Sequence, residues 1–132
     1  MSEVQSKGTV LLIDNNEKQN NSNRQALEFR LFKVYTATTY SEARGMIYDL
    51  KPDIILMEAE LPDGDGFSFC EEVDGTTTAS IIFLTSKSDH ADEMKGIKLG
   101  AYDYIKKPFY KDLMVARVEA VMRRRKRSVG GW

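Results

Sequence analysis

Cysteine, histidine and tryptophan are nearly absent from this sequence of 132 residues, which contains one of each. The single cysteine, Cys70, excludes an intramolecular disulfide framework and a cysteine-rich zinc site. No apolar run approaches the roughly 20 residues of a membrane-spanning helix, and residues 1–8 lack the charged and then apolar pattern of a signal peptide. These absences predict a soluble, cytoplasmic protein with no membrane partner.

The sequence has the length and composition of one globular domain. Hydrophobic residues make up 42% and charged residues 30%, which are ordinary values for a soluble protein. A chain of this length should bury roughly two-thirds of its unfolded surface, which is enough for a core without covalent cross-links.

The net charge of −1 conceals two regions of opposite sign. Residues 1–122 contain 14 basic and 20 acidic residues, a net charge of −6, whereas residues 123–127 are all basic. Such a run can bind nucleic acid or an anionic membrane, or it can be a solvated helix end whose cations suit the helix dipole. We favour the helix end, leading into a linker, because the acidic body would repel phosphates.

Short apolar runs alternate with longer amphipathic stretches along the chain. The apolar runs predict five strands, at residues 9–13, 33–37, 53–57, 80–85 and 101–105. The amphipathic stretches predict five helices, at residues 17–31, 41–50, 66–73, 88–99 and 110–127. Ser41 is the expected cap of the second helix, and Gly100 the left-handed end of the fourth. This alternation predicts an α/β, doubly wound domain with a parallel sheet between two layers of helices.

Polar residues stand where the predicted strands end. Asp14 and Glu58 follow the first and third strands, Thr85 ends the fourth, and Lys107 comes just after the fifth. Functional sites of doubly wound folds lie at this edge of the sheet. Two carboxylates can hold a cation such as Mg²⁺, and a lysine with a hydroxyl can bind phosphoryl oxygens. The acids could instead cap helices, but the combination favours a single pocket.

Five motifs, in this order, resemble the receiver domain of two-component response regulators, the CheY-like family. They are VLLIDNN from Val10, PDIILME from Pro52, LPDGDG from Leu61, IIFLTS from Ile81 and LGAYDYIKKPF from Leu99. The resemblance implies a flavodoxin-like fold with strand order 2-1-3-4-5, and a regulatory domain rather than an enzyme. It covers residues 9–124, which leaves residues 1–8 as an extended or disordered start and residues 125–132 as a basic linker or a cloning remnant.

The resemblance also implies a role for each polar residue at the predicted edge. Glu58 occupies the phosphoacceptor position, which is normally aspartate. Asp14 would be the first of an acidic pair that holds Mg²⁺ with the acceptor carboxylate and the backbone carbonyl of Glu60.

Three further residues take roles from the same resemblance. Lys107 would contact the phosphoryl oxygens, and the peptide bond that joins it to Pro108 would be cis. Thr85 would follow the phosphoryl group, while Tyr104 would swing inward as the aromatic switch.

Two departures from the family pattern are expected to weaken phosphorylation. Glu58 is one methylene longer than aspartate, a displacement on the order of an ångström, and Asn15 replaces the usual second acid. We therefore expect weakened Mg²⁺ binding and a receiver that acts with little or no phosphorylation. Glu58 would pair with Lys107 and accept a hydrogen bond from Thr85. An engineered aspartate-to-glutamate change is the other explanation, which Asn15 disfavours.

The last predicted helix resembles that of receivers joined to a winged-helix DNA-binding domain. In those relatives the fourth helix, fifth strand and fifth helix form a homodimer, in which acids such as Asp103 pair with arginines such as Arg117 across the interface. The implied partners are a sensor histidine kinase, which Glu58 would bypass, and a second copy of the chain. DNA binding would belong to an output domain outside this sequence.

Two alternatives stay open. The chain could be a competent Mg²⁺-dependent phosphoreceiver, with Glu58 or another residue as the acceptor. It could also be a flavin-binding electron carrier of the same fold, but residues 14–17 would repel the cofactor phosphate. A partial calcium-loop pattern from Leu61 lacks the required acid at its first position, so a turn is the better interpretation.

Overall fold

Five parallel strands form the central sheet in the computed structural model, which describes residues 5–129 and side chains as far as Arg127. The strands are β1 (Thr9–Ile13), β2 (Lys33–Ala37), β3 (Ile54–Met57), β6 (Ser80–Thr85) and β7 (Asp103–Lys106). They pair in the order β2-β1-β3-β6-β7. Counted along the chain, this is the predicted order 2-1-3-4-5.

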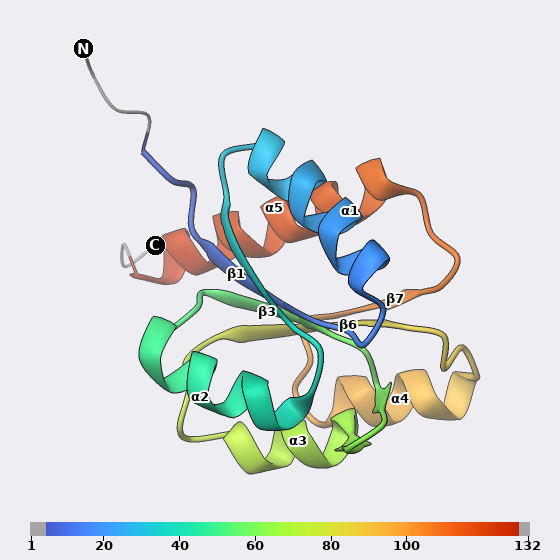
Figure 1. Cartoon of the computed structure of the whole chain (residues 1–132). Helices are drawn as coiled ribbons and strands as arrows, with labels where there is room; N and C mark the ends of the chain where they lie inside the picture. Colours follow the sequence, from blue (N-terminus) through green and yellow to red (C-terminus); the bar gives the residue numbers. More distant parts are fainter. Residues whose placement is uncertain (1–4, 130–132) are drawn as a thin grey trace.

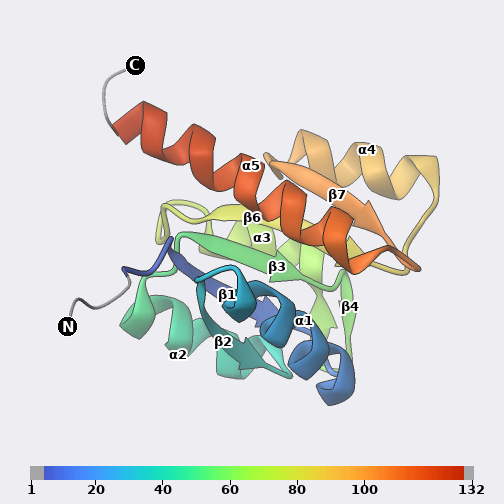
Figure 2. The ribbon, with the colours of Figure 1, turned by 90° about the horizontal axis from the view of Figure 1, so that it is seen from above.

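Helices cover both faces of the sheet, so the fold has three layers (Figure 1). One layer contains α1 (Glu17–Phe29) and α5 (Lys111–Val129), which lie side by side when seen from above (Figure 2). The other contains α2 (Tyr40–Leu50), α3 (Gly66–Val73) and α4 (His90–Lys98). The predicted doubly wound α/β fold is confirmed. None of the helices within residues 5–129 combines the length and the apolar character needed to cross a bilayer.

The sheet separates two apolar cores, and β1 shows how the sequence builds both. Leu11 and Ile13 pack into the core under α2, α3 and α4, whereas Val10 and Leu12 pack under α1 and α5. Because successive side chains of a strand point to opposite faces, a strand covered on both sides must be apolar throughout. Burying each of these side chains contributes on the order of 2 kcal/mol.

An antiparallel hairpin that the sequence did not predict follows β3. It consists of β4 (Glu60–Leu61) and β5 (Gly64–Asp65), and it leads directly into α3. Strands of two residues are too short to leave a periodic pattern. The turn expected there is present at residues 62–63, between the two short strands.

The beginning of α2 also differs from its prediction. Thr39, not Ser41, is the cap residue, because its side chain accepts a hydrogen bond from the Glu42 amide, and the helix begins at Tyr40. At the end of α4, Gly100 has a φ of +97°, the left-handed conformation expected for it.

The last helix is longer than expected and includes part of the predicted linker. α5 continues through Val129, so the segment 125–129 is helical. Arg125 donates hydrogen bonds to the Thr78 carbonyl at 2.7 Å and to the Ser80 hydroxyl at 3.0 Å. The basic run is therefore not a uniformly solvated helix end, since one of its members fastens α5 to the start of β6. The predictions for residues 1–4 and 130–132 lie outside the described residues.

Candidate functional site

Asp14, Glu58, Thr85 and Lys107 meet at the carboxyl edge of the sheet. They stand at or just after the ends of β1, β3, β6 and β7, which are neighbours in the sheet. The two acids and Thr85 are buried, and only 15% of the Lys107 side chain is exposed. The fold thus brings together the four residues that sequence reasoning placed in one pocket.

A single ammonium group joins the two carboxylates. The Lys107 Nζ lies 2.6 Å from the Asp14 Oδ2 and 2.9 Å from the Glu58 Oε2. Burial alone would lower the pKa of Lys107, but the hydrogen bonds with Asp14 and Glu58 outweigh it and raise the pKa above its usual value. Lys107 therefore keeps its positive charge although most of its side chain is shielded from solvent. The peptide bond between Lys107 and Pro108 is cis, as expected.

The second oxygen of Glu58 is occupied as well. The Glu58 Oε1 accepts hydrogen bonds from the Thr85 hydroxyl and from the Ala59 amide, the latter at 2.9 Å. Each carboxylate oxygen of Glu58 thus has at least one donor. The side chain is held in one orientation between the ends of β3, β6 and β7.

Hydrogen bonds extend from Thr85 to Tyr104 through the backbone of Lys87. The Lys87 amide donates to the Thr85 hydroxyl oxygen at 3.1 Å, and the Lys87 carbonyl accepts from the Tyr104 hydroxyl at 2.6 Å. The Tyr104 ring is buried, with 4% of its surface exposed, and packs against Phe83. A Cβ at Gly96 would lie only 2.9 Å from that ring, so the buried position of Tyr104 needs a glycine there.

Tyr40 is a residue of this site that sequence reasoning missed. Its hydroxyl donates to the Glu58 carbonyl at 2.5 Å, and its ring stacks on Phe69. Burial raises the pKa of Tyr40, so the hydroxyl stays protonated and can donate. A Cβ at Gly66 would lie 2.8 Å from this hydroxyl, so the contact also needs a glycine. Nothing in the local sequence pattern marks Tyr40, because its partner is a backbone atom 18 positions away.

Two further polar residues fix the ends of the elements around the site. Asp63, in the hairpin, accepts hydrogen bonds from the amides of Tyr40 and Ser41, both at 3.1 Å. The buried side-chain amide of Asn20 donates to the carbonyls of Asp14 and Ala37. Asn20 therefore cross-links the carboxyl ends of β1 and β2, which explains part of the polar character of α1.

The residues around Glu58 do not fit a Mg²⁺ ion as they are arranged. Both carboxylates of the predicted set, Asp14 and Glu58, are paired with Lys107. Within residues 5–127, no three His, Cys, Asp or Glu side chains are grouped to hold a metal. Since Mg²⁺ demands near-octahedral oxygen ligands, its binding would first require that Lys107 be displaced.

The cavity beside the two carboxylates is also very small. Asp14 and Glu58 line it together with Asn20 and Asn23, and it encloses about 10 Å³. That volume accommodates at most about one water molecule. A hydrated cation would need the side chains to move apart.

Asp103 and Arg117, which the resemblance places at a dimer interface, pair with each other within one chain. Their closest atoms are 2.9 Å apart. Around them the surface of α4, β7 and α5 exposes several large apolar side chains. We call this surface the α4–β7–α5 face; its exposed apolar residues are Met94, Ile97, Tyr102, Tyr110 and Leu113.

Comparisons with known proteins agree with this architecture. The chain is 35% identical over 126 residues to the "Probable transcriptional regulator ycf27" of Guillardia theta, covering 92% of this chain and 48% of the relative. It thus spans about half the length of that relative.

Solved structures agree as well. A two-component response regulator from Clostridium difficile is 29% identical with a TM-score of 0.85, covering 91% of this chain and 98% of that chain. The non-phosphorylated HemR receiver domain from Leptospira biflexa is 30% identical with a TM-score of 0.80, covering 86% and 93%. The model of the response regulator receiver domain matches residues 10–119. The chain therefore belongs to the response regulator receiver domain family, the CheY-like regulatory domains of two-component systems.

Proposed function

We propose that this receiver domain acts without phosphorylation, because the Glu58 carboxylate takes the place of a phosphoryl group. The observation that supports this is the double engagement of Glu58, which binds the Lys107 ammonium with one oxygen and the Thr85 hydroxyl with the other. Lysine and hydroxyl donors of this kind are suited to phosphoryl oxygens. In this chain, one permanent negative charge occupies them.

The same contacts make Glu58 a poor phosphoacceptor. An attacking carboxylate oxygen must approach the phosphorus in line, whereas hydrogen bonds and an ion pair on both oxygens hold the Glu58 side chain in another orientation. Phosphoryl transfer also depends on cations that neutralise the developing charge, and the arrangement of Asp14 and Lys107 does not fit a metal ion. Both arguments disfavour the alternative of a competent Mg²⁺-dependent phosphoreceiver.

The regulatory consequence would reach the α4–β7–α5 face through Thr85. The hydrogen bonds from Glu58 to Thr85, on to Lys87 and then to Tyr104 form a continuous path to the base of this face. Each such bond contributes on the order of 1 kcal/mol. The Glu58 charge would thereby hold Tyr104 inward and keep the face in one conformation.

The domain would exert its regulatory function by dimerising through the α4–β7–α5 face. Exposed apolar side chains on a face that also presents the Asp103–Arg117 pair suit an interface with a second copy. Receiver domains interact with sensor histidine kinases, and here Glu58 would bypass that input. Because a relative is named as a transcriptional regulator, we place the chain in cytoplasmic control of transcription, with DNA contacted by an output domain.

Intact-mass spectrometry after incubation with Mg²⁺ and acetyl phosphate tests the proposal. We expect no gain of a phosphoryl mass by the wild-type chain. The matched control is the double variant Glu58→Asp with Asn15→Asp, which restores the family residues and should gain that mass. Efficient phosphorylation of the wild-type chain would contradict the proposal.

A further inference from the structure

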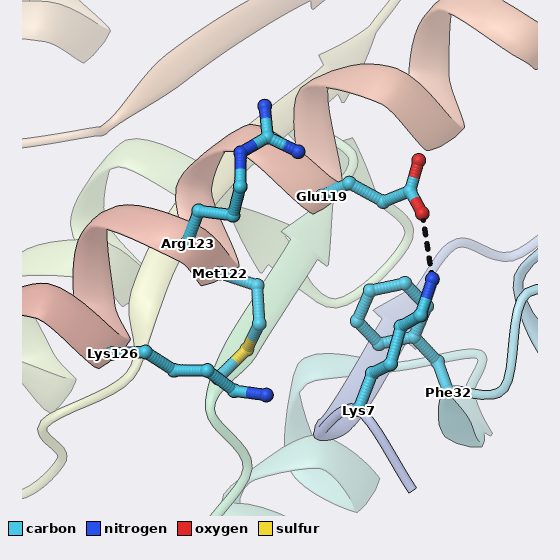
Figure 3. A pocket seen from close by; sticks show the side chains of 6 residues that line it. All are labelled: Lys7, Phe32, Glu119, Met122, Arg123 and Lys126. Carbon is cyan, nitrogen blue, oxygen red and sulfur yellow. Dashed lines mark hydrogen bonds and ion pairs between the residues drawn. The ribbon is translucent and has the colours of Figure 1, made fainter.

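A pocket of about 290 Å³ opens at the edge of the sheet opposite Glu58 (Figure 3). Lys7, just before β1, and Phe32, just before β2, line one side of it. The carboxyl-terminal half of α5 lines the other side. Its contributions are Glu119, Met122, Arg123 and Lys126. No role of the receiver site involves these residues.

The floor of this amino-edge pocket is apolar. Phe32 and Met122 are 4% and 8% exposed, and both belong to the core under α1 and α5. The Lys7 ammonium lies 5.9 Å from the centroid of the Phe32 ring, so it partly covers this floor. An apolar group that entered the pocket would contact the thioether and the ring, both favourable surfaces for an aromatic or aliphatic side chain.

The rim carries an excess of positive charge. Its one carboxylate, Glu119, is already paired with Lys7 at 2.9 Å and with Arg30 at 3.2 Å. The hydrogen bond from Lys7 lowers the pKa of Glu119, so the group stays ionised. Among the residues whose side chains are described, neither Arg123 nor Lys126 has an ion-pair partner. Four cations, namely Lys7, Arg30, Arg123 and Lys126, thus lie around one carboxylate whose negative charge is already paired.

This positive charge contrasts with the rest of the domain. Residues 1–122 have a net charge of −6, whereas the basic run 123–127, at this end of α5, has a net charge of +5. Of that run, Arg125 is committed to Thr78 and Ser80, Arg123 and Lys126 line the pocket, and Arg124 and Arg127 are exposed and do not line it. An acidic ligand would be repelled by most of the surface and attracted to this edge.

We infer that the amino-edge pocket binds an acidic segment of another protein, with one apolar side chain anchored on Phe32 and Met122. Carboxylates flanking that anchor would bind Arg123 and Lys126, where an arginine fork can hold a carboxylate by two hydrogen bonds. A volume of about 290 Å³ is just below the range of small-molecule pockets but suits one buried anchor residue.

Other polyanions fit these observations less well. A nucleic-acid backbone offers no apolar anchor for Phe32 and Met122, and its phosphates would meet the acidic body of the domain. An anionic membrane offers acyl chains, but its broad flat surface would also face the acidic body of the domain, residues 1–122 with a net charge of −6. Both enter the test as competing ligands.

Titration of the ¹⁵N-labelled chain with the peptide acetyl-Glu-Asp-Phe-Asp-Glu-amide, followed by amide shifts in NMR, tests the inference. We expect shifts centred on Lys7, Phe32 and Met122, with a dissociation constant on the order of 0.1 mM. The same peptide with alanine in place of phenylalanine should bind at least about tenfold more weakly. Equal binding by the two peptides, or no shifts at these residues, would overturn the inference.

A pair of charge-matched double variants separates the pocket from general electrostatics. Arg123→Glu with Lys126→Glu should weaken peptide binding about tenfold or more. Arg124→Glu with Arg127→Glu changes the net charge equally and should weaken it less than about threefold. An equal loss of peptide affinity in both double variants would show that overall charge, and not the pocket, determines binding, and would overturn the inference. Tighter binding to phosphatidylserine vesicles or to a single-stranded oligonucleotide than to the peptide would overturn the assignment of a protein partner.

Discussion

The Thr85 hydroxyl donates its hydrogen bond to the Glu58 carboxylate, and this contact links the end of β3 to the end of β6. On the other side of Glu58, the Lys107 ammonium pairs with both Glu58 and Asp14 and offsets one of their two negative charges. The carboxylate is thus a structural part of the sheet edge, with a donor on each of its oxygens.

Removal of the shared cation should destabilise the domain strongly. Lys107→Met leaves the buried carboxylates of Asp14 and Glu58 without a counter-charge, and breaking a buried ion pair in this way costs about 3–5 kcal/mol. Lys106→Met is the matched control, because Lys106 is more exposed and its pair with Glu93 is worth at most about 1 kcal/mol. Urea unfolding at neutral pH measures both. Similar losses of unfolding free energy in the two variants would show that the ion pairs of Lys107 contribute no more to stability than an exposed pair.

Stability should fall in alkali as tyrosines ionise. Burial first, and then nearby acids led by Asp92, raise the pKa of Tyr104 to about 12. The folded state therefore keeps the neutral phenol at a pH where the unfolded chain, with a tyrosine pKa of about 10, has lost the proton. This contribution is complete below pH of about 10 and is lost as the pH rises towards 12. Urea unfolding as a function of pH should show a smaller alkaline loss for Tyr104→Phe than for the wild type; identical curves would refute this.

Tyr40 should stabilise the loop after β3 through its hydroxyl. Tyr40→Phe removes the hydrogen bond to the Glu58 carbonyl and leaves that buried oxygen without this donor, a loss of about 1–3 kcal/mol. Tyr48→Phe is the control, since Tyr48 is 82% exposed and should change stability by less than about 0.5 kcal/mol. Thermal unfolding distinguishes the two variants. An unchanged midpoint in Tyr40→Phe would mean that water replaces the hydroxyl at no cost.

Dimerisation should depend on the α4–β7–α5 face. Leu113→Asp places a charge among its exposed apolar side chains and should make the chain monomeric in analytical ultracentrifugation. Phe29→Asp is the matched control on α1, where the side chain is 85% exposed but lies away from this face. A wild-type chain that stays monomeric at high concentration, or a dimer that Leu113→Asp leaves intact, would exclude this interface.

Much of the fold could be predicted because its strands are buried on both faces. A run such as residues 9–13 is apolar throughout, and the polar residue that follows it marks the carboxyl edge of a parallel sheet. That rule places Asp14, Glu58, Thr85 and Lys107 at one edge of the sheet, and their combination with the family spacing predicts a single pocket. Their roles in signalling rest on the family resemblance and stay predictions.

The features that the sequence could not predict depend on contacts between distant residues. Thr39 caps α2 instead of Ser41, and Tyr40, the first residue of the helix, stacks on Phe69, which is 29 positions away in the sequence. Arg125 fastens the end of α5 through hydrogen bonds to Thr78 and Ser80. These partners lie more than 40 positions away in the sequence, so the contact could not be predicted. Periodicity and charge reveal neither contact.

The most direct test of the central claim is an NMR titration of the chain with Mg²⁺ and beryllofluoride, a stable mimic of a phosphoryl group. If the Glu58 carboxylate already binds the Thr85 hydroxyl and the Lys107 ammonium in place of a phosphoryl group, the amide signals of β6, α4 and β7 should not change during the titration. The variant Glu58→Asp with Asn15→Asp should respond with large shifts in the same elements. Equally large shifts in the wild-type chain would show that the pocket awaits a phosphoryl group, and would contradict this account.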